Sequence, residues 1–275
     1  MTREDMQVLA EIVAARSGLV LPPDQAYLAE TRLAAVAHAE QLPGVDALLQ
    51  ALRAAPSEAL LSAVTDALAN SETVFFRDRL VFDLLRDAIL PTLAAARPRG
   101  VVRVWSAACS TGQEPYSLAM LAAGLPQLKL DLCASDLSES CLEKARAGRY
   151  TQFEVQRGLP IGHLLQWFEK SDEAWRVRPE LRQMVRWRRF NLLHDMAPLG
   201  RFDLILCRNA LMYLAPDARG AVLRRLAGAL APDGVLVLGA SEAVCDAPDM
   251  LEAAPGGRGL YTLRRDAGTA ARTGT

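Results

Sequence analysis

The sequence predicts a doubly wound, Rossmann-like α/β domain that follows a small all-α domain. Two observations predict it. Residues 2–69 carry only helix-period hydrophobic patterns separated by turns, whereas after Gly100 short apolar runs alternate with amphipathic stretches. Because buried strands that alternate with helices are typical of parallel sheets covered on both faces, the second part should form one such sheet.

Turns divide the helical part. Pro22 and Pro23 precede a second helix, Gly44 precedes a third, and Ser57 caps a fourth. We therefore expect an N-terminal helical domain at 1–69. A linker should follow at 70–99, with one amphipathic helix over 80–93.

The second part should be a single α/β domain over residues 100–265. At about 150–190 the alternation stops, and tryptophans and basic side chains gather, so we expect an insertion or subdomain there. Residues 266–275 should be a disordered tail. The expected strands are 101–105, 128–134, 202–207 and 234–239, and the expected helices are 113–123, 138–147 and 217–230.

The composition is that of an ordinary soluble protein, with 275 residues, 51% of them hydrophobic, and a formal net charge of −1. This balance argues against a nucleic-acid partner, which favours a strong basic excess. The five cysteines form no CxxC pair, so we expect buried thiols in a reducing compartment. No apolar run reaches the roughly 18 residues that span a bilayer. We therefore expect a cytoplasmic monomer with no membrane insertion.

The loop after the first strand favours S-adenosylmethionine over a dinucleotide. A dinucleotide site uses a G-x-G-x-x-G loop and a helix N-terminus that holds the pyrophosphate. Here the loop at 105–112 has one glycine, and Glu114 stands at the helix start. A carboxylate at that place repels phosphate and suits the amino group of a methionine moiety. A tight turn without a ligand is the alternative.

Asp136 ends the second strand, about 20 residues beyond this loop, where nucleotide-binding α/β folds place an acid on the ribose hydroxyls. The alternative is that Asp136 only caps the helix that starts near Ser138. In combination with the loop, the ribose role is favoured.

Six segments of the chain carry a more specific signal. They are NSETVFFRDRLVF at 70–82, WSAACSTGQEPYS at 105–117, ASDLSESCLEKARAGR at 134–149, FNLL at 190–193, FDLILCRNALMY at 202–213 and PDGVLVLGASE at 232–242. Together they resemble the chemoreceptor glutamate methyltransferases, the CheR family. The resemblance implies an S-adenosylmethionine-binding fold, methyl ester formation on receptor glutamates, and contact of the helical domain and the insertion with the receptor's helical bundle.

The resemblance also implies roles by position. Glu114 would hold the methionine amino group and Asp136 the ribose. Thr73 and Arg77 match the N-x-T-x-F-F-R segment of the linker, which contributes to the cofactor site, and Ser71 stands where its asparagine usually is. The other implied positions are Asn191 and Leu192 at the adenine, Arg208 and Asn209 beneath the sulfonium, and Tyr213 in the active site beside Arg77.

The implied reaction needs no general base, because a glutamate side chain has a reference pKa of about 4.3 and is already ionised at pH 7. The three histidines have neither metal nor triad spacing, and we expect no metal site. Arg77 and Tyr213 are the candidate catalytic residues, which would orient the carboxylates. Phe75 and Phe76 should be core residues that fix the linker.

Some family members also bind a peptide at the receptor's C-terminus through a β-subdomain in the insertion. The segment 168–177 is short and lacks a glycine-rich loop, which predicts an enzyme without such a tether. The insertion's arginines either meet an acidic receptor surface or form a solvated face. Two alternative functions remain: a methyltransferase for another substrate, and a non-catalytic adaptor that binds the cofactor.

Overall fold

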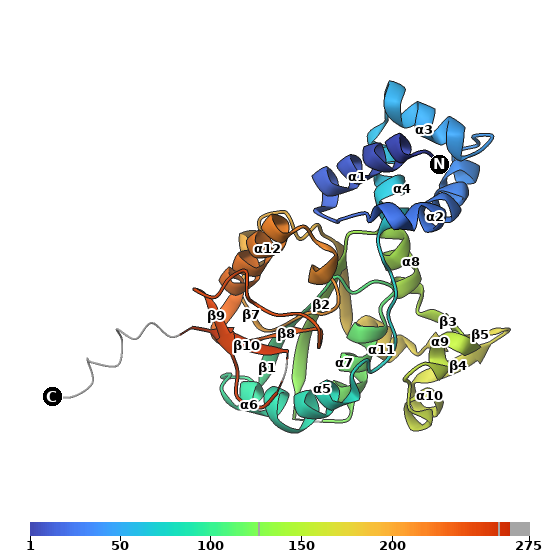
Figure 1. Ribbon diagram of the computed structural model, residues 1–275. Helices are drawn as coiled ribbons and strands as arrows, with labels where there is room; N and C mark the ends of the chain where they lie inside the picture. Colours follow the sequence, from blue (N-terminus) through green and yellow to red (C-terminus); the bar gives the residue numbers. More distant parts are fainter. Residues whose placement is uncertain (126, 258, 265–275) are drawn as a thin grey trace.

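The computed structural model describes residues 1–125, 127–257 and 259–264. Figure 1 shows a group of helices at the N-terminal end, a large sheet with helices around it, and a small sheet to one side. This arrangement confirms the predicted Rossmann-like α/β fold preceded by an all-α region. The tail predicted at 266–275 lies outside the described residues, and the exact domain limits stay a prediction.

The helical domain is built from capped helices around its own core. Thr2 and Asp5 form a reciprocal capping box at the first helix, and the Ser57 side chain accepts a hydrogen bond at the start of the fourth. Leu33 and Val64 are fully buried. The elements are α1 (Arg3–Ser17), a 3-10 turn η1 (Pro23–Gln25), α2 (Ala26–Ala39), α3 (Val45–Ala54) and α4 (Glu58–Leu68).

The linker helix predicted over 80–93 is interrupted by a π turn. Pro91 accounts for the interruption, because proline has no N–H to donate to the carbonyl four residues earlier. The segment is amphipathic as predicted, since Phe82 and Leu85 lie in the core and Arg86 is exposed. The three pieces are α5 (Arg79–Leu84), the π turn η2 (Leu85–Ile89) and α6 (Leu90–Ala95).

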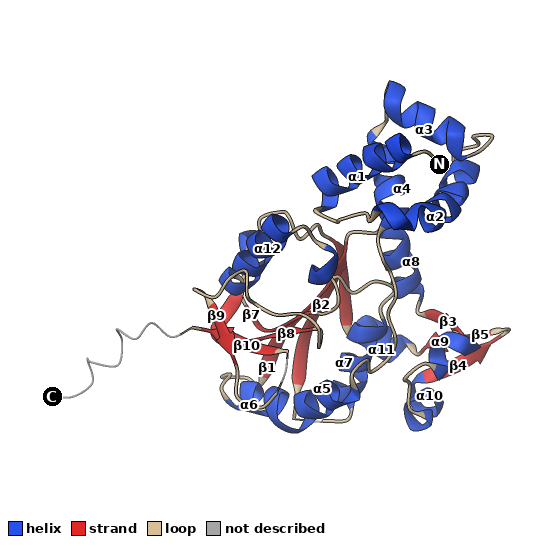
Figure 2. Ribbon diagram, viewed as in Figure 1, coloured by secondary structure: helices blue, strands red, loops and turns tan. Residues whose placement is uncertain are grey.

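A seven-stranded sheet forms the centre of the second domain (Figure 2). In chain order its strands are β1 (Val101–Ala107), β2 (Lys129–Asp136), β6 (Val185–Arg189), β7 (Phe202–Cys207), β8 (Leu230–Leu238), β9 (Leu251–Ala253) and β10 (Leu260–Leu263). The order across the sheet is β6-β2-β1-β7-β8-β10-β9. Pairing is parallel from β6 to β8 and antiparallel at β10 and β9.

Three of these strands were not predicted from the sequence. β6 lies inside the expected insertion, but it pairs with β2 at the sheet edge, so the insertion ends before residue 185 and not near 190. Its arginines at 186, 188 and 189 remove the apolar run that marks a buried strand. β9 and β10 have three and four residues, too few for a recognisable pattern.

Helices cover both faces of the sheet, as Figure 2 shows. α7 (Gln113–Ala123), α8 (Glu139–Ala147) and the linker helices share one core with Val104 of β1. α12 (Pro216–Gly228) shares the other core with Trp105, the next residue of the same strand. Because successive side chains of a strand point to opposite faces, β1 is buried on both sides.

The insertion is a small subdomain that packs on the linker. The ring of Phe75 lies 5.1 Å from that of Tyr150 and 5.6 Å from that of Phe168, and Phe76 stacks on His163. Both phenylalanines are buried, as predicted. The elements are β3 (Arg149–Thr151), α9 (Gln152–Gln156), α10 (Ile161–Trp167), β4 (Phe168–Ser171), β5 (Ala174–Val177) and α11 (Pro179–Gln183), with β5 central in a three-stranded sheet.

The prediction that all cysteines are buried is wrong in part. Cys109 follows β1 and Cys207 ends β7, and both are buried, whereas Cys245 is exposed in the loop after β8. Within the described ranges, no helix is both long and apolar enough to cross a membrane. The same part of the chain holds no cluster of His, Cys, Asp and Glu fit for a metal ion.

Candidate functional site

A cavity opens where the carboxyl ends of β1, β2 and β7 meet. The strand order reverses between β1 and β7, which is where doubly wound sheets bind ligands. The cavity encloses about 1050 Å³, its open mouth included. α4, the linker and the loops after the three strands line it. Every site residue named from the sequence lies on its wall: Ser71, Thr73, Arg77, Glu114, Asp136, Asn191, Leu192, Arg208, Asn209 and Tyr213.

Asp136 is held by backbone donors at the end of β2. One of its oxygens accepts a hydrogen bond from Ser110 N–H at 2.7 Å, and the other from Ser138 N–H at 2.9 Å. Ala108 and Ser110 adopt positive φ angles, which turn the loop after β1 toward this carboxylate. Burial raises the pKa of Asp136 above its usual value. Each oxygen keeps a lone pair for a ligand hydroxyl.

Glu114 begins α7 and is paired with a buried arginine. Its Oε1 accepts a hydrogen bond from Ser106 Oγ at 2.8 Å, and its Oε2 faces Arg208 Nη1 at 3.1 Å. Arg208 also binds Asp78 Oδ2 at 2.6 Å and the Arg77 carbonyl at 2.9 Å. Two carboxylates thus neutralise Arg208, which joins the linker to the sheet and has little charge left for a ligand.

Arg77 differs from Arg208 in that it forms no ion pair among the described residues. Its Nη1 lies 3.5 Å from the Glu72 carbonyl. The Glu72 carboxylate is paired with Arg157 instead, which is the main cause of its lowered pKa, and Arg77 adds to that effect only from a greater distance. Phe76 and Asp78 on either side have positive φ angles of 49° and 59°, so the linker bends sharply at this point. The bend places the guanidinium on the cavity wall.

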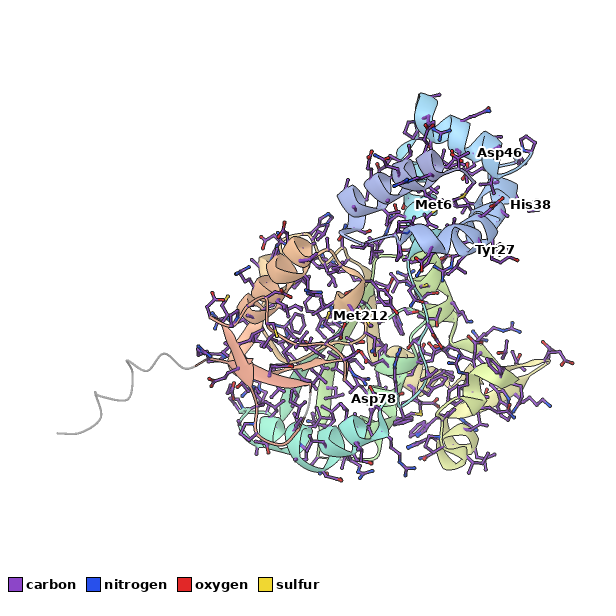
Figure 3. The ribbon with its side chains drawn as sticks, in the orientation of Figure 1. Met6, Tyr27, His38, Asp46, Asp78 and Met212 are labelled. Carbon is purple, nitrogen blue, oxygen red and sulfur yellow. The ribbon has the colours of Figure 1, made fainter. Side chains whose placement is uncertain are left out.

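Tyr213 lies on a short turn, η4 (Leu211–Tyr213), after β7. The N-terminal segment holds this turn from one side, since Val20 N–H donates to the Tyr213 carbonyl at 2.8 Å. Glu242 holds it from the other side, because its carboxylate accepts hydrogen bonds from the N–H groups of Asn209 at 2.7 Å and Met212 at 3.1 Å. Met212 and Asp78, labelled in Figure 3, locate this turn and the linker.

A family model for the CheR methyltransferase SAM-binding domain matches residues 71–259. The chain belongs to the CheR family. Chemotaxis protein methyltransferase Cher2 of Pseudomonas putida is 36% identical over 87% of this chain and 91% of its own length. Chemotaxis protein methyltransferase 1 of Pseudomonas aeruginosa is 37% identical over 92% and 96%. Family and cofactor are therefore as predicted, and S-adenosylmethionine is the ligand of this domain.

The solved structures of SAM-dependent methyltransferases are only distantly similar. A TehB-like SAM-dependent methyltransferase of Corynebacterium glutamicum is similar over 69% of this chain and 96% of its own, with 18% identity and a TM-score of 0.39.

In this CheR-family protein the side-chain amide of Asn191 is already hydrogen-bonded within the protein. Its Nδ2 donates to the Arg16 carbonyl at the end of α1 at 2.6 Å, and its Oδ1 accepts from Leu193 N–H at 3.0 Å. The amide therefore ties the helical domain to the catalytic domain. An adenine ring would therefore meet the backbone groups of Asn191 and Leu192 and not the Asn191 side chain.

Three residues of the site were missed from the sequence. Asp66 of α4 lines the cavity, and its carboxylate accepts a hydrogen bond from Glu139 N–H at the start of α8 at 3.2 Å. Burial raises the pKa of Asp66. Asn70 lines the cavity beside Tyr213. Asn70 and Glu242 carried a signal, since Asn70 begins the first of the six family-like segments and Glu242 ends the last. Asp66 carried none, because its place in the site depends on contacts across domains.

Proposed function

We propose that this CheR-family protein transfers a methyl group from S-adenosylmethionine to glutamate side chains of methyl-accepting chemoreceptors, forming methyl esters. The observation that carries the proposal is the unpaired guanidinium of Arg77 on the cavity wall. A free arginine suits a carboxylate, either that of the substrate or that of the cofactor. The printed names of the relatives, which are chemotaxis protein methyltransferases, support the choice of substrate.

The groups on the cavity wall fit S-adenosylmethionine. Asp136 can accept hydrogen bonds from two ribose hydroxyls, and Glu114 can accept them from the methionine amino group, since both carboxylates keep free lone pairs. Bound there, the cofactor supplies an electrophilic methyl group on a cationic sulfur. The proposed remainder of the site is Ser71, Thr73, Asn191, Leu192, Arg208 and Asn209.

The proposed reaction is a direct displacement. A glutamate oxygen bonds to the methyl carbon while the carbon–sulfur bond breaks, and that bond's electron pair stays on sulfur as a neutral thioether. No proton moves, and among the described residues that line the cavity none is a histidine. The protein's work is positioning, with reacting atoms about 3–3.5 Å apart. We propose that Arg77 and Tyr213 orient the carboxylates.

We propose that the partner is the cytoplasmic helical bundle of a chemoreceptor. A second hollow, lined by apolar side chains that include Val20, Leu28 and Met212, lies on the helical-domain side of Tyr213 and is open to such a helix. Val20 and Met212 are 53% and 48% exposed. The protein would act as a monomer in the cytoplasm.

The insertion supports a proposal of tether-independent action. β4 and β5 are joined by Asp172 and Glu173 alone, which leaves no room for a glycine-rich loop. Arg178 of the insertion is paired with Glu169, and Arg186 of the adjoining strand β6 is paired with Asp131. The insertion is therefore not one free basic surface.

The test is transfer of labelled methyl from S-adenosylmethionine to receptor-containing membranes, followed by alkali, which releases methyl esters as volatile methanol. We expect base-labile counts with the wild type and a loss of at least about 100-fold with Arg77→Ala, as for removal of an orienting charged group. Arg79→Ala is the matched control, because the Arg79 side chain is 83% exposed outside the cavity; it should keep full activity.

Other outcomes separate the alternatives. Base-stable counts would indicate a different acceptor group. Tight binding of S-adenosylhomocysteine without any transfer would contradict the proposal and favour the non-catalytic adaptor.

A further inference from the structure

The side chain of Asn70 is hydrogen-bonded to the hydroxyl of Tyr213. Asn70 Nδ2 lies 2.5 Å from the phenolic oxygen, although 143 positions separate the two residues. Asn70 belongs to the segment that follows α4, and Tyr213 to the turn after β7. The contact therefore joins the end of the helical domain to the candidate catalytic residue.

The direction of this hydrogen bond is fixed by a second contact. Asn70 Oδ1 accepts a hydrogen bond from the backbone N–H of Glu72 at 3.3 Å, and an N–H group can only donate. The amide oxygen must therefore face Glu72, and the NH₂ group must face Tyr213. Glu72 is itself held by an ion pair with Arg157 at 2.6 Å.

Because the NH₂ group donates, the phenolic oxygen of Tyr213 is the acceptor and its own proton is left free. We propose that Asn70 is a positioning residue that keeps the Tyr213 O–H available as a donor to the substrate carboxylate. This inference rests on the proposed function. It concerns how the tyrosine is oriented, not whether the cofactor binds.

The location of the pair agrees with this role. Asn70 and Tyr213 both line the cofactor cavity, and both also line the second hollow on the helical-domain side. The pair thus stands between the two spaces. A glutamate side chain that approaches the cofactor from the second hollow passes the Tyr213 hydroxyl.

The test compares Asn70→Asp with Asn70→Leu, alone and in the Tyr213→Phe background. The Asp carboxylate is similar in size to the amide but only accepts hydrogen bonds. The Tyr213 O–H would therefore donate to this carboxylate and would no longer be available to the substrate. We expect kcat to fall about 10- to 100-fold for Asn70→Asp and for Tyr213→Phe, the range of one lost hydrogen bond to a charged group. Asn70→Leu should lose less, and affinity for S-adenosylhomocysteine should stay unchanged in all.

The double variants distinguish positioning from a merely structural role. In the Tyr213→Phe background, Asn70→Leu should have no further effect on kcat. Asn70→Asp should only raise the KM in this background, because the new carboxylate repels the substrate carboxylate. Equal losses of kcat in the wild-type and Tyr213→Phe backgrounds would overturn the inference, and so would an unchanged kcat for Asn70→Asp. In either case methyl transfer by the wild type would still support the proposed function. Absence of methyl transfer by the wild type would overturn both.

Discussion

The two walls of the cofactor cavity are held in place by different means. The sheet wall, Glu114 and Asp136, is fixed by groups close in the catalytic domain, such as the N–H groups of Ser110 and Ser138. The tyrosine wall, Tyr213 with Asn70, is fixed by segments far apart in the chain, including Val20 and Glu242. Cofactor binding should therefore depend on the catalytic domain and the linker, and methyl transfer on the helical domain as well.

This difference has a physical reason. A strand, its following loop and the next helix position a carboxylate within one α/β unit, and that geometry repeats wherever the unit folds. The tyrosine turn has three residues and only the local backbone hydrogen bonds of a 3-10 turn, so its position also depends on the distant groups that hold it.

Asp136→Ala should weaken binding of S-adenosylhomocysteine about 100-fold. Two hydrogen bonds from ribose hydroxyls to a charged acceptor would be lost, at about 1.5 kcal/mol or more each. Isothermal titration calorimetry measures the change. Tyr213→Phe, on the other wall, should leave the Kd within about twofold. Similar losses in the two variants would contradict the separation of the walls.

Glu242→Gln should destabilise the protein by about 1–3 kcal/mol. In the wild type both carboxylate oxygens accept hydrogen bonds from backbone N–H groups, those of Asn209, Met212 and Gly239. A glutamine would place its NH₂ group, which is itself a donor, against at least one of these N–H groups. kcat should fall with it, since the Tyr213 turn loses its anchor. Thermal melts and methyl-transfer rates measure both effects. Glu252→Gln is the control, because Glu252 makes only a 3.9 Å contact with Arg264 at the surface. An equal effect of both variants would argue against the anchor.

Asn191→Ala should lower stability by about 1 kcal/mol through loss of the contact with the Arg16 carbonyl. Cofactor affinity should stay within about twofold, because the amide is already satisfied by the protein and the adenine meets backbone groups. Denaturant unfolding and calorimetry give the two values. A large fall in affinity with unchanged stability would show that this side chain turns to the adenine.

Asp66→Asn should change the pH dependence of stability. Burial raises the pKa of Asp66 in the folded protein above its usual 3.8, so between the two values the folded state binds more protons than the unfolded state. The stability contributed by protonated Asp66 is complete below pH 3.8 and is lost as pH rises through the raised pKa. The wild type should therefore lose stability relative to the variant along this range. Parallel unfolding profiles would contradict this.

Sequence patterns predicted the parts of the site that are local. Glu114 and Asp136 follow predicted strands, and the carboxyl ends of parallel strands meet at one edge, so their convergence could be expected. Arg77 and Tyr213 came from segments that resemble the CheR family. β6 escaped because an edge strand rich in arginine has no apolar run, and Asp66 escaped because an acid on an amphipathic helix carries no signal of what it faces.

By itself the sequence determined the two-part organisation, the four N-terminal helices, the alternation of β1, β2, β7 and β8 with their helices, and the chemical character of the cofactor loops. Propensity, capping and hydrophobic period act over a few residues, which is why these parts could be predicted. Only the tertiary structure decided that Asn70 donates to Tyr213, that Asn191 is used between domains, and that Arg208 is neutralised while Arg77 is free. Hydrogen bonds and ion pairs between distant segments depend on how whole elements pack, and no local pattern records that packing.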